Sequence, residues 1–357
     1  MRDSLDGALD LSDYLIEANG FIPVPLIITE PALGNFGFGI APVFLRKKKP
    51  ELVNGKYRIR PPDVTAAAAA YTANNSWLVG AARMATIPKY GLRYKVGFAY
   101  ADINLSYFRK VGDQEKEFEF NIKSTPVYLN VNRELKDIRW QIGIQYIYAH
   151  TKLKLADSSV LADFVKDKEV NSTVSALGVV GEYDSRDNIF TTDKGLKAHA
   201  HVNFSEQFLG SDFNYQRINS FLYWFFPVRK NSSAGKNWIS GLRFDFQQML
   251  GDPPFYIVPS IDLRGVPAVR YQGKTNVLIE TEQRWDFVRR WSAVFFGGLG
   301  KAFNHYDEFG DAQLVYNYGG GFRYLVARKF KLRMGVDLAR GPDNWAYYII
   351  FGSAWRK

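Results

Sequence analysis

The chain of 357 residues contains no cysteine, which excludes disulfide bonds, thiolate zinc sites and catalysis by a thiol. It has no apolar run that approaches the ~18 residues of a membrane-spanning helix. Histidine is scarce as well, with 4 residues, so a site built from several imidazoles has few candidates. The mean hydropathy of −0.22 fits a soluble protein, and it fits a transmembrane β-barrel equally well, because lumen-facing positions are polar.

Aromatic and basic residues, by contrast, are plentiful. Aromatics make up 16% of the chain, with 21 tyrosines and 27 phenylalanines. Lysine and arginine outnumber aspartate and glutamate by 46 to 36, which gives a net charge of +10 and a pI near 9.4. A basic excess of this size suits nucleic acid, an anionic membrane surface or no specific partner. With 46% hydrophobic and 23% charged residues, the composition is that of a folded protein.

Apolar residues recur with a period of two along most of the sequence, which predicts two-faced strands. In 314–325, one face carries Leu314, Tyr316, Tyr318, Phe322 and Tyr324. A soluble β-sandwich or propeller would alternate too. Strands of roughly 9–11 residues, aromatic clusters at 221–226 and 345–351, and alternating short and long connections favour a transmembrane barrel instead.

We therefore expect an all-β fold, a transmembrane antiparallel β-barrel of about sixteen strands. About eleven strands are expected before the loop at 261, starting near Phe36, Asp63, Ser76, Arg93, Ile103, Glu117, Ile138, Ser172, Leu196, Phe213 and Trp238. About five more are expected near Asn276, Trp291, Leu314, Lys331 and Trp345. The segment 93–110 is divided into two strands at Ala101 and Asp102.

Residues 1–35 are expected to form a periplasmic segment ahead of a barrel at 36–357. Apolar spacing predicts a short helix through Leu5, Ala8, Leu9, Ser12, Leu15 and Ile16, followed by an extended, proline-rich lead-in. The helix either packs on the barrel mouth or acts as a plug or partner-docking segment. The basic segment 45–50 is expected in an outward-facing loop, either simply solvated or directed at lipopolysaccharide phosphates.

Few residues suggest catalysis or cofactor binding. His199 and His201 share one strand face and could hold a metal, but no third ligand lies nearby in the sequence, so a polar lumen lining is favoured. The sequence contains neither a nucleophile-elbow motif nor a phosphate-binding glycine loop. We expect no metal, no cofactor and no enzymatic activity.

One turn-rich stretch, "IDLRGVPAVRYQGKTN" at 261–276, carries more than a surface loop needs. Its glycines and proline mark it as a loop, yet Leu263 and Val266 are apolar and lie on either side of Arg264. On the strand that follows, Glu280 and Glu282 share one face.

These segments resemble the BamA/TamA superfamily of outer-membrane assembly and transport barrels, also called bacterial surface antigens. "DLRGVPAVRYQGKTN" followed by "VLIETEQRW" looks like the family's long loop, with its motif at Leu263, Arg264 and Gly265. The resemblance implies that the loop folds back into the barrel and that five strands follow it. It also implies that Arg264 docks on lumen-facing carboxylates, for which Glu280 and Glu282 are the candidates.

The sequence departs from the family in three respects. An aromatic residue is usual where Val266 stands, and an acidic residue is common where Gly298 stands. Family assembly factors also carry POTRA domains ahead of the barrel, whereas only about 35 residues precede the first expected strand. We therefore expect a barrel-only member without POTRA domains.

The resemblance implies a place in the outer membrane of a Gram-negative bacterium and a role in inserting or transporting protein or lipid through a lateral seam. Gly37, Gly39 and Pro42 in the first strand and Gly352 in the last are expected to weaken that seam. The alternative is a passive or structural barrel, either an obstructed pore or an oligomeric scaffold. Expected partners are outer-membrane lipid, lipopolysaccharide, client outer-membrane proteins and a second copy of the chain, but not nucleic acid.

Overall fold

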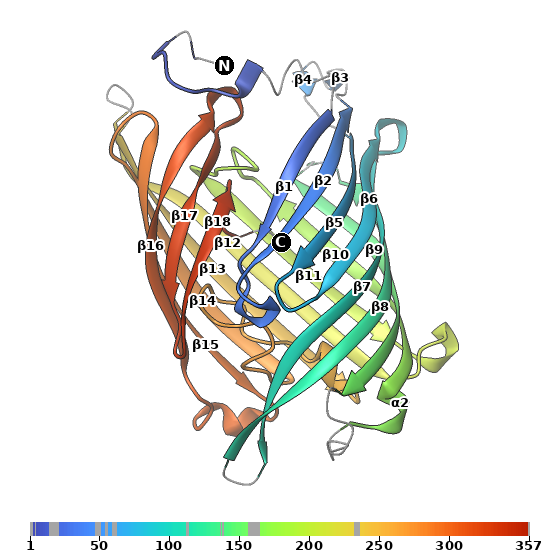
Figure 1. Ribbon diagram of the computed structural model, residues 1–357. Coiled ribbons are helices and arrows are strands. Elements are labelled where there is room, and N and C mark those ends of the chain that lie inside the picture. Colours follow the sequence, from blue (N-terminus) through green and yellow to red (C-terminus); the bar gives the residue numbers. More distant parts are fainter. Residues whose placement is uncertain are drawn as a thin grey trace.

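The computed structural model is an antiparallel β-sheet of sixteen strands that rolls into a nearly closed barrel (Figure 1). It describes residues 3, 5–13, 21–46, 51–53, 56–58, 63–111, 114–135, 137, 139–155, 165–231 and 236–355. Each strand pairs with the next barrel strand along the chain, so hairpins connect the whole sheet. The all-β, sixteen-stranded fold expected from the sequence is confirmed.

The first half of the sheet contains β1 (Phe21–Ile28), β2 (Gly37–Arg46), β5 (Asp63–Thr72), β6 (Trp77–Ile87), β7 (Leu92–Val111), β8 (Gln114–Glu134), β9 (Trp140–Leu155) and β10 (Asn171–Asp184). The second half contains β11 (Gly195–Ser205), β12 (Tyr215–Asn231), β13 (Lys236–Gly251), β14 (Thr275–Asp286), β15 (Trp291–Phe303), β16 (Val315–Ala327), β17 (Leu332–Arg340) and β18 (Trp345–Phe351).

Short elements connect these strands. They are a small sheet of β3 (Glu51–Val53) and β4 (Lys56–Arg58), the helix α2 (Asp167–Val170), and the 3-10 turns η1 (Pro31–Leu33), η2 (Pro88–Tyr90), η3 (Gln207–Leu209), η4 (Phe255–Ile257), η5 (Tyr306–Phe309) and η6 (Arg328–Phe330). No helix in the part of the chain that the structure describes is long and apolar enough to cross a bilayer.

Two local errors in the strand prediction cancel in the total. The segment 93–110 forms part of one strand, β7, rather than two, and its ladder with β8 runs through Ala101 and Asp102. Asp102 is accommodated there because Lys123 on β8 lies 3.1 Å away. The strand gained is β1, which belongs to the barrel although 21–28 was expected as a lead-in.

β1 was missed because its sequence, FIPVPLII, does not alternate in polarity. It nevertheless pairs with β2 along its whole length, from Phe21 opposite Phe44 to Ile28 opposite Gly37. The barrel therefore begins at Phe21 and not at residue 36. Prolines are tolerated in β1 because it is an edge strand, where not every N–H needs a partner.

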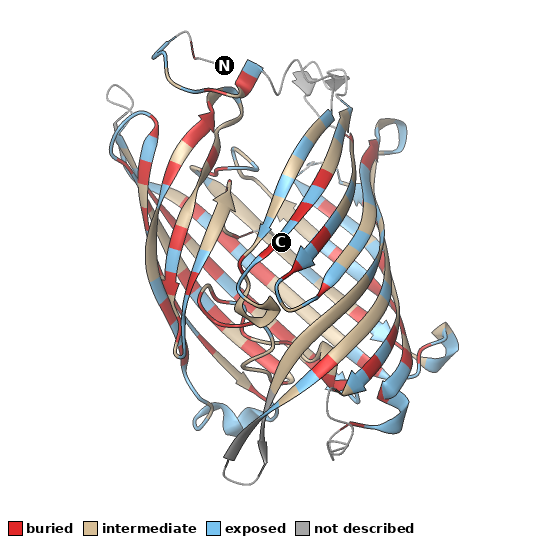
Figure 2. Ribbon diagram, in the orientation of Figure 1, coloured by how far each residue is buried: buried red, intermediate tan, exposed pale blue. Residues whose placement is uncertain are grey.

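The two faces of the barrel differ as a transmembrane barrel requires. Large apolar side chains such as Phe98, Ile144 and Phe295 are more than half exposed and face outward. Buried and exposed positions alternate along many of the strands (Figure 2). Charged side chains of the second half point inward and are buried, including Glu280 and Asp337. Because a buried charge is tolerated only when it is paired, these residues must form ion pairs inside the barrel.

The start of β1 and the end of β18 lie at the same end of the barrel, which we call the N-terminal end; the opposite end is the loop end (Figure 1). Because β1 precedes β2, the end of β2 returns to the N-terminal end, with Phe44 opposite Phe21. The basic segment 45–50 was expected at the end opposite the N-terminus. This prediction is wrong for Leu45 and Arg46, which lie at the N-terminal end. Residues 47–50 lie outside the described part of the chain.

The N-terminal segment lies on the rim of the barrel at this end. The Leu11 N–H donates to the Val326 carbonyl, at 2.8 Å, so the segment packs on the mouth. The predicted helix is wrong for Leu5, which lies in a turn, for Ala8, which is irregular, and for Leu9, which forms a bridge, while Ser12 begins a helical stretch. Leu15 and Ile16 lie outside the described residues.

Aspartates hold this segment on the rim. Asp3, Asp6 and Asp10 all bind the guanidinium of Arg290, and Asp3 and Asp10 also bind Arg328. The hydrogen bond from Arg328 lowers the pKa of Asp3 to about 2. Arg290 lowers the pKa of Asp6. Burial opposes ionisation of Asp10, but hydrogen bonds from Ser12 and Arg290 outweigh it, so that its pKa is lowered too.

Acid should release the segment from the rim. A carboxyl whose pKa is depressed in the docked form stabilises that form fully at a pH above its ordinary pKa of 3.8. This stabilisation is lost as the pH falls toward the depressed pKa of about 2. Protease accessibility of 3–13 should therefore stay low at neutral pH and rise between those two values, while circular dichroism of the barrel changes little. A segment still protected at pH 2, or already accessible at pH 7, would contradict this assignment.

Candidate functional site: the inward loop and the seam

The loop 252–274, between β13 and β14, folds into the barrel rather than away from it. A bridge between Ser260 and Gln272 turns it back on itself. Its buried apolar residues form one cluster with the barrel wall: Ile261, Leu263 and Val266 against Leu278 and Val315. This packing explains why a stretch rich in turn formers is also apolar.

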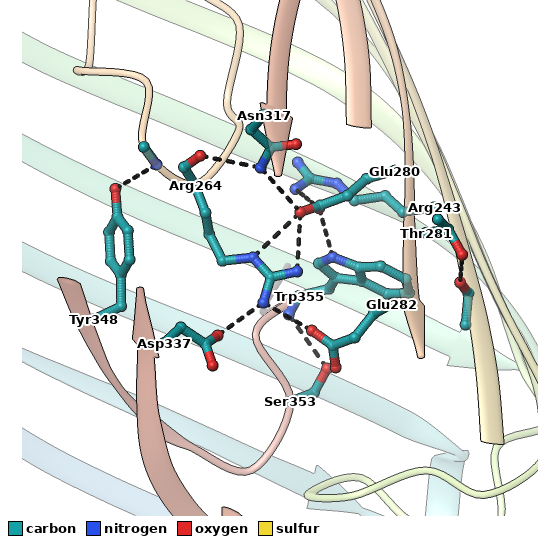
Figure 3. A network of polar contacts seen from close by, with 12 residues as sticks. Arg243, Arg264, Glu280, Thr281, Glu282, Asn317, Asp337, Tyr348, Ser353 and Trp355 are labelled. Carbon is teal, nitrogen blue, oxygen red and sulfur yellow. Dashed lines mark hydrogen bonds and ion pairs between the residues drawn. The ribbon is translucent and has the colours of Figure 1, made fainter. Parts of the chain in front are cut away.

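Arg264 projects from this loop into a group of carboxylates (Figure 3). Its guanidinium lies 2.9 Å from Glu280 and 2.8 Å from Glu282, the two carboxylates named from the sequence. A third, Asp337 of β17, lies 2.8 Å away. The guanidinium also stacks on the Phe296 ring, at 3.5 Å from its centroid. Only 10% of the Arg264 side chain is exposed, so these attractions are weakly screened by water.

Asp337 supplies the acidic partner that Gly298 does not. A Cβ at Gly298 would lie 3.0 Å from the Leu263 side chain, so the loop approaches too closely for an acidic residue there. Asp337 reaches Arg264 from the next strand but one, and it also binds Arg323 through two contacts of 2.5 and 2.9 Å. Asp337 was not predicted as a partner, although it shares the polar face of 332–340 with Arg333.

Gly265 fixes the loop against the last hairpin. Its φ of +84° is left-handed, and a Cβ there would lie 2.8 Å from the backbone nitrogen of Gly341, in the turn between β17 and β18. Its N–H donates to the Tyr348 hydroxyl of β18, at 2.8 Å. A larger residue at 265 would be strained and would push the loop away from this turn.

Glu280 is the centre of the network, and its side chain has no exposed surface. It accepts hydrogen bonds from Arg264, from Arg243 of β13 at 3.3 Å, and from the indole N–H of Trp355 at 2.7 Å (Figure 3). The C-terminal tail thus enters the lumen and binds the same carboxylate as the loop. Trp355 also packs in an aromatic cluster with Phe221, Tyr223 and Phe225. This tail was not predicted from the sequence, because no local pattern marks a docking tryptophan.

Gly352 directs the tail inward. It follows the end of β18 at Phe351 and has a left-handed φ of +77°. Its N–H donates to the Arg333 carbonyl, and a Cβ would lie 2.7 Å from the Phe190 carbonyl oxygen. The prediction that Gly352 weakens the ladder of the last strand is therefore wrong, because this glycine forms the turn beyond the strand.

The sheet has two free edges, β1 and β18. In the described part of the chain the strand order begins at one and ends at the other, with no ladder between them, and Figure 1 shows them facing each other. We call this boundary the seam. Gly37, Gly39 and Pro42 were expected to line it, but they lie in β2, which pairs with β1 on one side and β5 on the other. They are one strand away because β1 was taken for a lead-in.

Solved structures show the same architecture. BamA from Haemophilus ducreyi lacking POTRA domains 1-3 superposes with a TM-score of 0.61 and 12% identity over 93% of this chain and 69% of that one. The chain has the fold of a BamA-type barrel. CdiB from Acinetobacter baumannii gives a TM-score of 0.61 at 11% identity, over 93% of this chain and 59% of that one. CdiB from Escherichia coli gives 0.62 at 8% identity, over 92% and 61%.

No family model and no curated protein sequence matches the chain. At sequence identities of 8–12%, the similarity to these structures is one of fold. The chain spans about three fifths of the length of the CdiB proteins. What this BamA-type barrel shares with its relatives is therefore its arrangement of strands.

The β1 edge of this BamA-type barrel is poorly suited to pair with a regular strand. Pro23 lies opposite Pro42, and neither has an N–H, so the hydrogen-bonded pairs of this ladder are the neighbouring ones, such as Val24 with Ala41. Alternate residues of a strand point their backbone polar groups toward opposite neighbours. Pro23 and Pro25 therefore face the seam, where they remove two N–H groups. Because an unpaired N–H in hydrocarbon costs several kcal/mol, this makes a free edge tolerable in a bilayer.

The inward loop touches both sides of the seam at the loop end. The Ala268 N–H donates to Glu30, just after β1, at 2.9 Å. On the other side, Arg270 and Tyr271 bind Asp343, just before β18, at 3.3 and 2.8 Å. Burial raises the pKa of Glu30. One loop of this BamA-type barrel thus holds the two edge strands near each other while leaving them unpaired.

His199 and His201 point into the lumen from β11. Their ring nitrogens lie 3.1 Å apart, and Glu182 lies 3.5 Å from His199. Among the described residues, no group of three or more histidine or carboxylate side chains is placed to hold a metal ion. His199 stacks on Phe221, and both histidines form part of the polar lining.

Proposed function

We propose that this chain is an outer-membrane barrel that moves protein or lipid between the bilayer and the barrel interior through the seam between β1 and β18. The observation that carries the proposal is the pair of free edges in a barrel whose other strands are all hydrogen-bonded on both sides. A sheet with exposed edges is unusual in a membrane, where every backbone polar group needs a partner. The outward apolar belt supports a place in the outer membrane.

The loop and the tail inside the lumen support lateral rather than axial movement. They meet at Glu280, so a solute that passed along the barrel axis beside the second half of the sheet would have to break a buried ion network. The seam offers a route that leaves this network intact. The proposed partners are therefore membrane lipids or client outer-membrane proteins, and the proposal assigns no catalytic role to any residue.

A passive or structural barrel is the second candidate. The same obstruction of the lumen favours it, because a scaffold requires neither an open axis nor a working seam. The two candidates differ in what happens when the seam is held shut.

A cross-link across the seam tests the proposal. The chain has no cysteine, so Ile27→Cys on β1 and Tyr347→Cys on β18, both outward-facing, can be joined by a short bis-maleimide. In liposomes the joined protein should lose its ability to speed folding of a client barrel or movement of a fluorescent lipid between leaflets. The matched control joins Leu338→Cys with Tyr347→Cys, which already pair across β17 and β18, and should keep full activity. Full activity of the seam-linked protein would favour the passive barrel.

A further inference from the structure

The lumen is not polar all round. Residues that pair across a ladder point to the same face of the sheet, so the pairing identifies the inward side chains of β1, β2, β5 and β6. The inward residues are aliphatic or glycine at every position along four ranges: Ile22–Ile28, Gly37–Leu45, Val64–Ala70 and Leu78–Met84. We call this surface the inner apolar wall. It contrasts with the charged wall of the second half, and a water-filled lumen would not require it.

No loop or tail among the described residues packs on the inner apolar wall, whose side chains are mostly half-buried by their neighbours in the sheet. The loop and the tail pack against the opposite strands, in the clusters around Leu263 and Trp355. The wall itself borders an open hollow of about 340 Å³, lined by Ala41, Ala68, Gly80, Ala82, Gly97 and Ala99 among others. Along β2 the wall runs from Gly37 to Leu45, roughly 26 Å of strand at about 3.3 Å per residue, which is near the length that a tilted strand needs to cross a hydrocarbon core. An apolar surface of this extent that faces a hollow indicates a binding surface.

The wall is continuous with the lipid-facing surface around the free edge of β1. That strand is apolar on both faces, with Ile22 and Val24 inward and Phe21 and Ile27 outward. A client strand would add to the edge through main-chain hydrogen bonds. Pro23 and Pro25 prevent that on this side of the seam. Hydrocarbon needs no hydrogen bonds, so an acyl chain can pass this edge and lie on the wall.

Two cations border the wall toward the N-terminal end. Lys95 on β7 lies beside Met84 in the inward register, and Arg93 lies beside Thr86. Neither side chain forms a hydrogen bond or an ion pair with another described residue. Lys95 interacts only through longer-range electrostatics, attractively with Glu182 and repulsively with Lys197. Both side chains are half-buried.

Outward residues at the same height mark the level of the headgroups. Arg83 lies next to Met84 on β6 and donates to the side chains of Thr65 and Tyr94 on the outer surface, at 2.8 and 2.9 Å. An arginine and a tyrosine on the lipid-facing side belong at the membrane interface. Lys95 therefore stands at the depth of lipid phosphates, although it faces the lumen.

We propose that the inner apolar wall binds the acyl chains of an anionic membrane lipid, which enters past β1 and places its phosphate at Arg93 and Lys95. This names the substrate class of the proposed seam and rests on that seam being open to the bilayer. Lysine and arginine bind phosphate through charge-assisted hydrogen bonds. A client polypeptide strand is the competing occupant, and the test separates the two.

The test compares neighbouring residues on opposite faces of β5. Ala68→Cys places a fluorophore on the inner apolar wall, and Ala67→Cys places it on the lipid-facing surface. In nanodiscs of phosphatidylglycerol with brominated acyl chains, quenching is expected at both positions. Quenching at 67 alone overturns the proposal. Ala82→Cys and Ala81→Cys on β6 repeat the comparison if either label at β5 disturbs folding.

The headgroup assignment is tested in the same system. Arg93→Gln with Lys95→Gln should reduce quenching at 68 toward its level in unbrominated lipid, and should leave quenching at 67 unchanged. Lys89→Gln, in the turn η2 of the same hairpin, is the matched control and should change neither. Equal quenching at 68 by brominated phosphatidylcholine, unaffected by the double substitution, would overturn an anionic ligand. Quenching at 68 by an added amphipathic strand peptide carrying a quencher, and not by lipid, would overturn lipid as the occupant.

These readouts do not depend on transport. Lipid quenching at 68 in a protein whose seam-linked form keeps full activity would preserve the lipid site and reject the proposed function. Loss of activity on cross-linking without lipid quenching at 68 would preserve the seam and reject the lipid site.

Discussion

Arg264→Ala is expected to lower the free energy of unfolding by about 3–5 kcal/mol, the usual cost of removing one partner from a buried ion pair. The substitution would leave Glu280, Glu282 and Asp337 near one another without the cation between them. It would also empty the space on the Phe296 ring. The temperature at which the barrel loses its folded mobility on semi-native gels should fall, and proteases should cut the loop 252–274 sooner.

Lys274→Ala is the matched control for this prediction. Lys274 ends the same loop, but it is only half-buried and its ammonium forms an exposed hydrogen bond to a backbone carbonyl, that of Gly251, at 3.0 Å. Its removal should change stability by no more than about 0.5 kcal/mol, as for other surface substitutions. If Arg264→Ala and Lys274→Ala behaved alike, Arg264 would not be the anchor of the loop.

Asp337→Asn is expected to cost a similar amount, about 3–5 kcal/mol, for a different reason. Asp337 is the ion-pair partner of Arg323, and both side chains are almost completely buried. Asparagine keeps the size of the side chain but leaves Arg323 as a buried charge with no counter-ion among the described residues. Urea titration of the purified barrel measures the loss.

A double substitution separates pairing from packing at this site. Arg323→Leu combined with Asp337→Leu removes both charges, and replacing a buried pair by apolar residues is often close to neutral. The double variant should therefore be more stable than Asp337→Asn. Glu282→Gln serves as a milder comparison, because Glu282 is partly exposed and Arg264 keeps two other carboxylates. A double variant less stable than the single one would show that the ion pair is not what Asp337 contributes.

The sequence predicted those parts of the fold that depend on alternation. Each half-apolar strand from β9 onward has one face for lipid and one for the lumen, so its pattern alone identifies it. The partners of the loop motif could also be predicted. Arg264 among apolar residues requires carboxylates, and Glu280 and Glu282 lie on one face of the next strand.

The features that were missed depend on long-range geometry. β1 is apolar on both faces because one face meets lipid and the other belongs to the inner apolar wall, so alternation could not reveal it. Trp355 docks on Glu280 across 75 residues of sequence, and no local pattern predicts where a terminal tryptophan will pack. Asp337 became a partner of Arg264 only through the register of β17. The seam was placed one strand too late for the same reason, since its position follows from where the first strand begins.

The central claim is that β1 and β18 lie side by side without a ladder, and a distance measurement in the bilayer tests it most directly. Spin labels at Ile27→Cys and Tyr347→Cys report the separation of the two edge strands, and labels at Leu338→Cys and Tyr347→Cys report that of a hydrogen-bonded pair. The account predicts a longer and broader distance distribution across the seam than across β17 and β18. Two distributions of the same short mean and width would show a closed barrel and would contradict it.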